Sequence, residues 1–267
     1  MEKSSLQHKA TVIENRKLCR DHYLLVLQKE HLSKAVLQGQ FVNIRIHSKE
    51  ELLLRRPFSV ARSNPERSLV EIVYRVVGKG TAAMTGLSPG ETVDVLGPLG
   101  KGFCLPEQPM TCLLIGGGVG IAPLWGVAKG LSERRSQIIA LLGFRSLDAV
   151  YGLDVLRDYG SETIVATDDG SFGLRGLVSD HVEGILKRKI DRVYVCGPPL
   201  MLKAVIPMIR REKIRGEVSV EERMGCGFGV CLSCAVHVRK EGVVEKQRAC
   251  TEGPVFDVEE IVLDDET

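Results

Sequence analysis

Residues 111–133 of the 267-residue chain read TCLLIGGGVGIAPLWGVAKGLSE. The apolar run CLLI is followed directly by closely spaced glycines, and then by a stretch with helical spacing that begins near Pro123. This order is typical of a buried strand, a tight glycine turn and a helix. The segment therefore predicts the first strand of a parallel sheet that is covered by helices on both faces.

The chain downstream repeats this alternation of strands and helices. Apolar runs at 137–144, 162–167 and 191–198 predict further buried strands, and helical patterns cover 176–188 and 201–212. Strands that alternate with helices are typical of α/β domains with a parallel sheet. We therefore expect one such domain at residues 106–216.

The chain upstream of this domain has a different pattern. Residues 1–105 contain six short stretches rich in Val, Ile and Leu, with Gly, Pro, Asn and Ser between them and no long helical segment. The six are 10–18, 23–28, 41–47, 58–63, 69–77 and 91–97. Such short, regularly interrupted strands predict a small antiparallel β-barrel. From residue 217 to residue 267 a third part is rich in glycine and cysteine, so we expect a multi-domain protein.

Composition excludes several classes of function. The chain is 44% apolar and 26% charged, which is typical of a soluble globular protein. A net charge of +2 argues against a nucleic-acid partner, and the cysteine-rich part has no basic cluster. No apolar run reaches the ~20 residues of a membrane helix. The start, MEKSSLQHKA, lacks the apolar segment of a signal peptide, so we expect a cytoplasmic location.

The glycine turn could hold a diphosphate. It contains Gly116, Gly117, Gly118 and Gly120, before Pro123. Glycines let the backbone approach a ligand, and a helix N-terminus offers free N–H groups. However, the spacing is not GxGxxG, so a purely structural turn fits equally well. Two further segments, GFRS at 143–146 and CGPPLM at 196–201, follow expected strands, where open α/β sheets bind ligands.

Four of the eight cysteines have the spacing C-x4-C-x2-C-x15-C: Cys226, Cys231, Cys234 and Cys250. The first two intervals are those of the plant-type [2Fe–2S] ligand loop. Four thiolates also suit zinc, but structural zinc sites usually pair two short CxxC knuckles, and Cys250 has no such neighbour. A disulfide is disfavoured in a reducing cytosol. The pattern favours a [2Fe–2S] cluster, with zinc as the alternative.

The order of several motifs resembles the ferredoxin reductase superfamily. The motifs are RRPFSV at 55–60, GKGT at 78–81, GGGVGIAP at 116–123 and CGPPLM at 196–201. Together with TDDGSFG at 167–173 and EERMGCGFGVCLSC at 221–234, they make essentially the whole chain resemble the electron transfer subunits of NAD-dependent dihydroorotate dehydrogenases. This resemblance implies an FAD-binding barrel at 1–105, an NAD-binding domain at 106–216 and a [2Fe–2S] module at 217–267.

The resemblance also implies roles for residues of the barrel in binding FAD. These residues are Arg56, Pro57, Phe58, Ser59, Tyr74, Arg75, Gly78, Lys79, Gly80 and Thr81. It implies that the Arg56 guanidinium holds a flavin phosphate, for which its geometry is suited. Phe58 would pack on the flavin ring and Ser59 would bond near its N5. Residues 78–81 would form the second flavin-phosphate loop, with backbone N–H groups as the donors and the Thr81 hydroxyl in addition.

Binding of NAD is implied for a second set of residues, in addition to the glycine turn: Asp168, Asp169, Cys196, Gly197 and Pro198. In related reductases that use NADPH, a serine and an arginine bind the 2′-phosphate at the strand end occupied here by the two aspartates. Two carboxylates would repel that phosphate, so NAD is favoured over NADP. The same residues are also good turn formers.

These parts would form an electron relay. Nicotinamide exchanges a hydride, the cluster exchanges single electrons, and FAD can do both. The resemblance implies a partner subunit with FMN that oxidises dihydroorotate to orotate in pyrimidine biosynthesis, in a heterotetramer with two copies of each chain. No residue resembles a base for dihydroorotate, so we expect NADH diaphorase activity alone from the isolated chain. The alternatives are a subunit of a sulfide dehydrogenase or a ferredoxin–NADP transhydrogenase, and a zinc-binding regulatory protein without enzyme activity.

Overall fold

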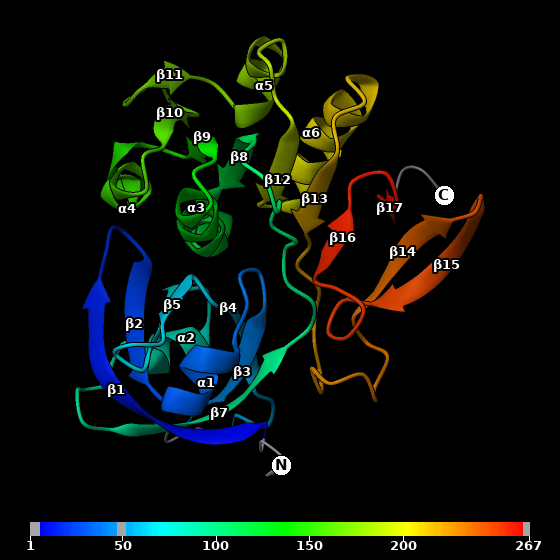
Figure 1. Cartoon of the computed structure of the whole chain (residues 1–267). Helices are drawn as coiled ribbons and strands as arrows, with labels where there is room; N and C mark the ends of the chain where they lie inside the picture. Colours follow the sequence, from blue (N-terminus) through cyan, green and yellow to red (C-terminus); the bar gives the residue numbers. More distant parts are fainter. Residues whose placement is uncertain (1–5, 47–51, 264–267) are drawn as a thin grey trace.

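The computed structural model describes residues 6–46 and 52–263. The chain forms a β-barrel, an α/β domain above it, and a C-terminal module that lies against both (Figure 1). No helix in these two ranges is both long and apolar enough to cross a membrane.

The barrel is a seven-stranded antiparallel sheet with the order β4-β3-β7-β1-β2-β6-β5. Its strands are β1 (Gln7–Lys17), β2 (His22–Gln28), β3 (Phe41–Arg45), β4 (Arg56–Ser59), β5 (Arg62–Asn64), β6 (Leu69–Arg75) and β7 (Thr92–Leu99). Two short helices complete it, α1 (Glu30–Ala35) and α2 (Lys79–Met84). The predicted antiparallel barrel is confirmed, with one more strand than the six expected.

The additional strand arises because the stretch expected at 58–63 divides in two. Val60 N–H donates to Gln40 O at 3.0 Å, whereas Ala61 N–H donates to Glu71 O at 2.8 Å. The chain therefore exchanges β3 for β6 as its partner within one residue. Both residues are buried, so this change of partner takes place inside the protein.

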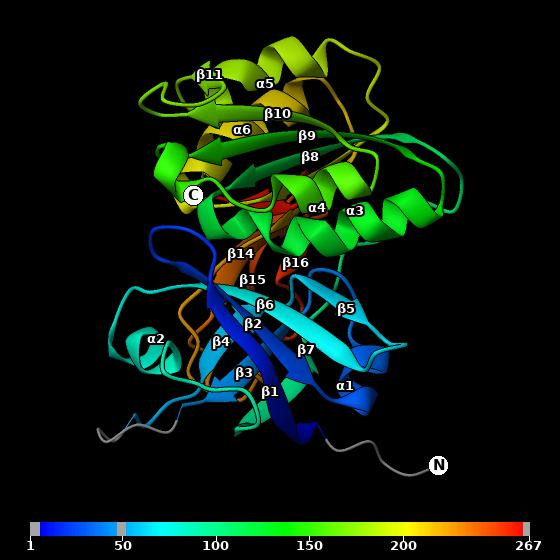
Figure 2. The same ribbon diagram turned by 90° about the vertical axis from the view of Figure 1, so that its left-hand side faces the viewer.

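The second sheet has the order β11-β10-β9-β8-β12-β13-β16, and all its pairs are parallel except that of β13 with β16. Its strands are β8 (Thr111–Gly117), β9 (Gln137–Phe144), β10 (Glu162–Thr167), β11 (Leu174–Arg175), β12 (Arg192–Cys196), β13 (Gly216–Ser219) and β16 (Val255–Asp257). Helices α3 (Pro123–Glu133) and α4 (Leu153–Asp158) pack on one face, and α5 (Val178–Leu186) and α6 (Pro199–Arg211) on the other (Figure 2). Two 3₁₀ turns, η1 (Gly118–Ile121) and η2 (Leu147–Ala149), follow β8 and β9. The predicted parallel sheet with helices on both faces is confirmed.

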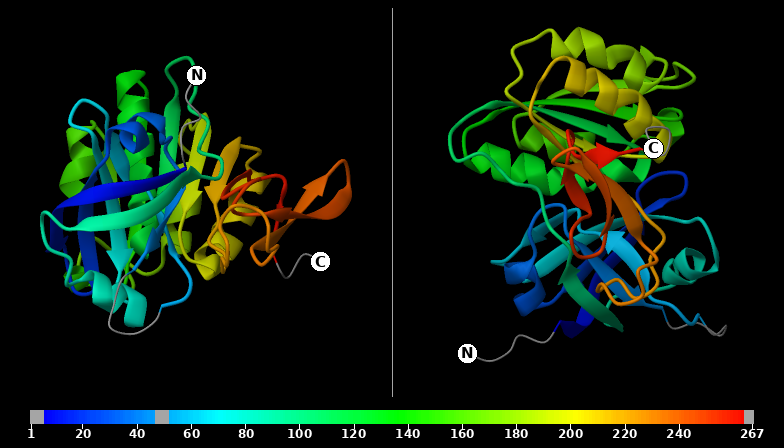
Figure 3. Two further views of the ribbon diagram at one scale, coloured as in Figure 1. Left: turned by 90° about the horizontal axis from the view of Figure 1, so that it is seen from below. Right: turned by 90° about the vertical axis from the view of Figure 1, so that its right-hand side faces the viewer.

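The C-terminal module contains a small sheet with the order β15-β14-β17. Its strands are β14 (Ala235–Lys240), β15 (Val243–Arg248) and β17 (Ile261–Val262). The β14–β15 hairpin projects from the body of the molecule (Figure 3). The module also supplies β16 to the α/β sheet, although this strand lies beyond the expected boundary at residue 216. Pairing with β16 covers the edge of β13, which would otherwise expose unpaired backbone groups.

Contacts between the barrel and the α/β domain fix their arrangement. The rings of His22 and Tyr151 stack with centroids 5.2 Å apart. Gly126 N–H donates to Ala61 O at 2.8 Å, which joins α3 to the segment between β4 and β5. These contacts hold α3 and the segment that follows β9 against the barrel.

Candidate functional site

The structure brings two distant motifs of the barrel together. A Cβ on Gly80, in the loop at 78–81, would lie 3.2 Å from Nε of Arg56 on β4. The neighbouring Arg55 is occupied elsewhere, because its Nη2 lies 2.8 Å from Asp94 Oδ2 and its Nη1 donates to Asp94 O at 3.0 Å. Of the two adjacent arginines, Arg56 is the one placed beside the glycine loop.

Residues 78–81, expected as a loop, are the N-cap and first turn of α2, and Thr81 shapes this turn. Its Oγ1 accepts hydrogen bonds from Val77 N–H at 2.9 Å and Gly78 N–H at 3.2 Å, and donates to Gly78 O at 3.1 Å. The hydroxyl is thus used within the loop, which differs from the expected contact with a phosphate. A Cβ on Gly78 would meet no atom within 4 Å, so the backbone there can be approached. Lys79 follows as the first residue of α2.

The side chains of Tyr74 and Arg75 have partners inside the barrel. Tyr74 is 1% exposed, donates to Asn15 Oδ1 at 3.1 Å, and packs edge-to-face on Phe58 with centroids 6.0 Å apart. Burial raises the pKa of Tyr74 to about 12. Arg75 Nε lies 2.7 Å from Asp21 Oδ2. Tyr74 is therefore a buried support for Phe58, whereas the Arg75 side chain stays exposed beside its ion pair.

The glycine turn after β8 has one position that is free for a ligand. Gly116, Gly117 and Gly120 are packing positions, since a Cβ on each would meet protein atoms at 2.9, 2.6 and 2.7 Å. Gly118 differs, because its φ is +55° and a Cβ there would meet nothing within 4 Å. Its carbonyl accepts a hydrogen bond from the Tyr151 hydroxyl at 3.0 Å. Close packing therefore accounts for glycine at three of these positions, whereas Gly118 faces open space.

The segment after β12 packs directly against this turn. Cys196 pairs with Gly116 in the β12–β8 register, and a Cβ on Gly120 would lie 2.7 Å from Cys196 O and from Gly197. Cys196 is 2% exposed, and burial raises the pKa of its thiol. Pro198 then leads into α6. The two predicted nucleotide motifs thus form one surface, with Pro123 at the start of α3.

The two aspartates after β10 have different surroundings. Asp169 Oδ1 accepts from Ser171 N–H at 2.9 Å and from its hydroxyl at 2.6 Å, which lowers the pKa of Asp169. Burial raises the pKa of Asp168, against the opposing effect of the nearby Arg145. Arg145 follows β9 in the GFRS segment, and sequence reasoning did not single it out. Asp169 is therefore part of the turn, and Asp168 is the freer carboxylate.

Glu221 is a further candidate that sequence reasoning missed. It follows β13, and its side chain is exposed, yet desolvation raises the pKa of its carboxyl. Burial is the main cause of the raised pKa values of Cys196 and Tyr151. The negative charge of Glu221 raises both pKa values further. Glu221 is therefore near enough to the nucleotide turns for its charge to act on Cys196 and Tyr151. The signal in the sequence was its position at a strand's carboxyl end, where α/β sheets bind ligands.

The four cysteines of the C-terminal module form two pairs. In the first pair, Cys226 N–H donates to Cys231 Sγ at 3.4 Å and Cys231 N–H donates to Cys226 Sγ at 3.5 Å. Ser233 Oγ lies 3.1 Å from Cys231 Sγ. Hydrogen bonds from Ser233 and from the Cys226 backbone lower the pKa of Cys231 to about 6. These donors favour a thiolate in the exposed pair.

The second pair is buried beneath the first. Cys234 and Cys250 are 2% and 1% exposed, their thiols interact, and Gly229 N–H donates toward the Cys250 sulfur. Within 6–46 and 52–263, no three His, Cys, Asp or Glu side chains converge on a single ion position. Two pairs of thiols suit a [2Fe–2S] cluster, in which each iron takes two protein ligands.

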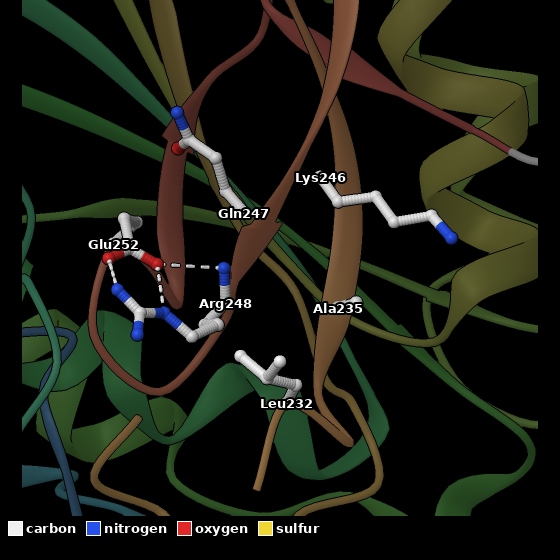
Figure 4. A pocket seen from close by; sticks show the side chains of 6 residues that line it. All are labelled: Leu232, Ala235, Lys246, Gln247, Arg248 and Glu252. Carbon is white, nitrogen blue, oxygen red and sulfur yellow. Dashed lines mark hydrogen bonds and ion pairs between the residues drawn. The ribbon is translucent and has the colours of Figure 1, made fainter. Parts of the chain in front are cut away.

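Arg248 joins the two segments that carry these pairs. Its Nη1 donates to Gly229 O at 2.9 Å, and its Nε donates to Glu252 Oε2 at 2.9 Å. Figure 4 shows this ion pair at one side of an open groove of about 600 Å³. The groove is lined by Leu232, Ala235, Lys246, Gln247, Arg248 and Glu252. The loop with Cys226 and Cys231 is thereby tied to the turn with Cys250.

Comparison with known families agrees with these three parts. Residues 9–103 match the oxidoreductase FAD-binding domain, and residues 114–206 match the oxidoreductase NAD-binding domain. Residues 221–262 match the iron–sulfur cluster binding domain of dihydroorotate dehydrogenase B. The dihydroorotate dehydrogenase B (NAD(+)) electron transfer subunit of Shouchella clausii is 40% identical over 259 residues, covering 96% of this chain and 98% of that protein. The chain belongs to this family.

The electron transfer subunit of Geobacillus thermodenitrificans is similar to the same degree, with 40% identity over 264 residues, 96% of this chain and 99% of that protein. A solved structure of an NADH-dependent reduced ferredoxin-NADP oxidoreductase contains a chain that superposes with a TM-score of 0.84. The two chains are 33% identical, and the superposition covers all of the present chain and 93% of the other. As a family member, the chain is an NAD-linked oxidoreductase subunit with FAD-binding, NAD-binding and iron–sulfur domains, and the family name implies a catalytic partner subunit.

Proposed function

We propose that the chain carries electrons between NAD and an FMN-containing catalytic subunit that oxidises dihydroorotate to orotate. The observation that carries this proposal is the pairing of the four cysteines in a module that adjoins both the barrel and the α/β domain. The relatives at 40% identity are named electron transfer subunits of dihydroorotate dehydrogenase B (NAD(+)). A cytoplasmic location and a heterotetramer with two copies of each subunit belong to the same proposal.

In the barrel, Arg56 and the backbone of residues 78–81 would hold the flavin diphosphate. Support comes from the approach of Gly80 to the Arg56 side chain and from the open space at Gly78. Phe58, supported by Tyr74, would contact the flavin ring, and Ser59 would lie near N5. Domain boundaries near residues 105 and 216 are part of this proposal, with β16 as the strand that crosses into the α/β sheet.

In the α/β domain, Gly118 would admit the NAD diphosphate at the start of η1. Cys196, Gly197 and Pro198 would form the wall beside the nicotinamide, and Glu221 would face it from the end of β13. Asp168 would disfavour a 2′-phosphate by charge repulsion.

In the C-terminal module, Cys226 and Cys231 would bind one iron of a [2Fe–2S] cluster, and Cys234 and Cys250 the other. Backbone N–H groups already point at the sulfurs, which is how protein loops tune such clusters. When bound, the nicotinamide supplies two-electron hydride chemistry and the cluster supplies single-electron chemistry, with FAD able to exchange either. The chain's own part would be to position these groups relative to one another.

The catalytic partner would dock on the exposed apolar loop around the cluster. Phe228, Val230 and Leu232 are 51%, 73% and 65% exposed, next to the exposed Cys231. Leu232 also has φ +59°, a conformation that is unfavourable for leucine and that is retained mainly where function requires it. Leu232 also lines the groove shown in Figure 4. An apolar, solvent-exposed loop of this kind is typical of an interaction site.

The first experiment is the visible absorption spectrum of anaerobically purified protein before and after addition of NADH. We expect flavin bands over a broad iron–sulfur background, and both should bleach. A colourless preparation that contains zinc would overturn the proposal. The isolated chain should reduce artificial acceptors with NADH but should not oxidise dihydroorotate, and robust dihydroorotate turnover by the chain alone would contradict the assignment of that step to a partner.

A second candidate function is electron transfer in a ferredoxin–NADP transhydrogenase complex. It is favoured by the 33% identity and full coverage of this chain in the oxidoreductase structure described above. Reconstitution discriminates between the two. Dihydroorotate-dependent NAD reduction on addition of a dihydroorotate dehydrogenase catalytic subunit supports the first function, and NADH-dependent ferredoxin chemistry with a different partner supports the second.

A further inference from the structure

Asn43 lies on β3 of the barrel but points away from the barrel interior. Its neighbours Val42 and Ile44 belong to the barrel core, and side chains alternate along a strand. Asn43 therefore faces outward, yet it is only 1% exposed. The segment that covers it is the ligand loop of the C-terminal module, which runs alongside the barrel (Figure 3).

The Asn43 side chain contacts the backbone of this loop directly. Its Nδ2 donates to Cys226 O at 3.3 Å, although the two residues are 183 positions apart. The next residue, Gly227, has φ +79°, and a Cβ there would overlap Nδ2 of Asn43. Glycine at 227 thus serves both the left-handed backbone and the close approach of the amide.

The backbone of Asn43 is paired with the strand assigned to the flavin. In the β3–β4 register Asn43 lies opposite Pro57, and Phe41 lies opposite Ser59. Directly opposite residues share one face of the sheet. A single residue therefore joins the strand with the RPFS motif to the loop that carries Cys226.

One polar atom of this side chain has no partner. Asn43 Oδ1 is buried and accepts no hydrogen bond from the described residues. A buried acceptor of this kind is unfavourable for folding, and an apolar side chain of similar volume would avoid the cost. The amide is thus better explained by its contact with the cluster loop than by the stability of the barrel.

We propose that Asn43 is a positioning residue that fixes the cluster loop against the flavin-bearing strand and thereby sets the rate of electron exchange between cluster and flavin. This inference rests on the proposed function of the cysteine loop and of β4. It does not involve the NAD site, since Asn43 has no contact with the glycine turns among the contacts described for it.

The test compares Asn43→Leu with Asn64→Leu, a control at the edge strand β5, where the amide oxygen accepts from Arg67 N–H within a turn. Both proteins are mixed rapidly with NADH under anaerobic conditions. Flavin reduction is followed by its absorption band, and cluster reduction by freeze-quench electron paramagnetic resonance. In Asn43→Leu we expect unchanged flavin reduction and cluster reduction slowed about tenfold or more, because small misplacements of reacting groups have large kinetic effects. The control should match the parent protein in both phases.

Equal cluster reduction in Asn43→Leu and the parent protein, with full iron and flavin content in both, would overturn the inference and leave the proposed function intact. A parent protein without a cluster signal would instead overturn the proposed function. If Asn43→Leu loses its iron during purification, Asn43→Ala decides, because it removes the hydrogen bond to Cys226 O without adding bulk against the loop. Slowed cluster reduction or loss of iron in Asn43→Ala, with normal flavin content, supports the inference. Full iron content and cluster reduction at the parent rate would overturn it.

Discussion

Arg55 and Arg56 are adjacent in the sequence but have different partners. Arg55 is paired with Asp94 across the barrel, whereas Arg56 lies beside Gly80 in the expected phosphate loop. Arg56→Ala should therefore weaken FAD binding by about tenfold to a hundredfold, since a hydrogen bond to a charged group contributes ~1.5–3 kcal/mol. Arg55→Ala should lower the melting temperature but bind FAD normally. Fluorescence titration of the apoprotein with FAD checks the first, and thermal unfolding checks the second.

Asp168 is predicted to select against the 2′-phosphate of NADP. Its carboxylate is outside the hydrogen-bonded turn of Asp169 and Ser171, so it can be replaced without breaking that turn. Asp168→Ser should raise the kcat/KM for NADPH relative to NADH by about tenfold, because one repulsive charge is removed while Arg145 remains nearby. The control is Asp154→Ser on α4. An unchanged coenzyme ratio in Asp168→Ser would place the adenosine elsewhere.

Glu221 predicts a pH-dependent effect on stability. Because desolvation raises the pKa of this carboxyl in the folded protein, its ionised form disfavours folding. The penalty is absent below the pKa of an unfolded glutamate, about 4.3, and it grows as the pH rises toward the folded pKa. Glu221→Gln should therefore raise the melting temperature at neutral pH and leave it unchanged in acid. Glu66→Gln, in the turn before β6, is the control, and a melting shift that is equal at both pH values would contradict the prediction.

Among the elements, the loop that leads into α2 depends on a single hydroxyl. Thr81 Oγ1 accepts from two backbone N–H groups, and its loss would leave both without that partner. Thr81→Val should weaken FAD binding by about tenfold, because each lost bond contributes ~0.5–1.5 kcal/mol to the loop conformation. Thr81→Ser retains the hydroxyl and should bind FAD normally. Comparable weakening in both variants would indicate that packing of the methyl group matters instead.

The strands that were predicted well are those with a strong local pattern. The runs at 137–144 and 162–167 coincide with β9 and β10, because continuous apolar residues are buried on both faces of a parallel sheet. The division of 58–63 into β4 and β5 was not predictable, since it depends on which strand offers a partner at Val60 and Ala61. The crossing of β16 into the α/β sheet likewise depends on an exposed edge that exists only in the folded chain.

In the candidate site, the sequence likewise could not predict which side chains contact one another. Spacing indicated the cluster ligands, but only the fold shows that Cys226 pairs with Cys231 and Cys234 with Cys250. Sequence also could not show that the Thr81 hydroxyl is used within its own loop. Asn43 was missed because it belongs to no motif, and its contact with Cys226 joins segments that are distant in sequence. Glu221 was missed although it opens the stretch EERMGCGFGVCLSC, because only the cysteines of that stretch have the spacing of cluster ligands.

At the scale of the whole molecule, the cysteine module lies against both the barrel and the α/β domain, and its apolar loop is exposed. The exposed loop with Phe228 and Val230 belongs to the cysteine module, and the glycine turns proposed to bind NAD belong to the α/β domain. Binding to the partner and reaction with NADH should therefore be separable by mutation.

The double variant Phe228→Ser/Val230→Ser should lose the complex while NADH diaphorase activity persists. Large apolar side chains at the centre of an interface each contribute about 2 kcal/mol, so the dissociation constant should rise by roughly a hundredfold or more. Size-exclusion chromatography with the catalytic subunit measures the complex, and dihydroorotate-dependent NAD reduction measures its function. Leu177→Ser, an exposed leucine before α5, is the control and should leave both unchanged. Because Phe228 and Val230 flank the cluster cysteines, iron content must stay at the parent level. A variant that keeps its iron and its diaphorase activity and still forms the complex would place the partner on another face of the molecule.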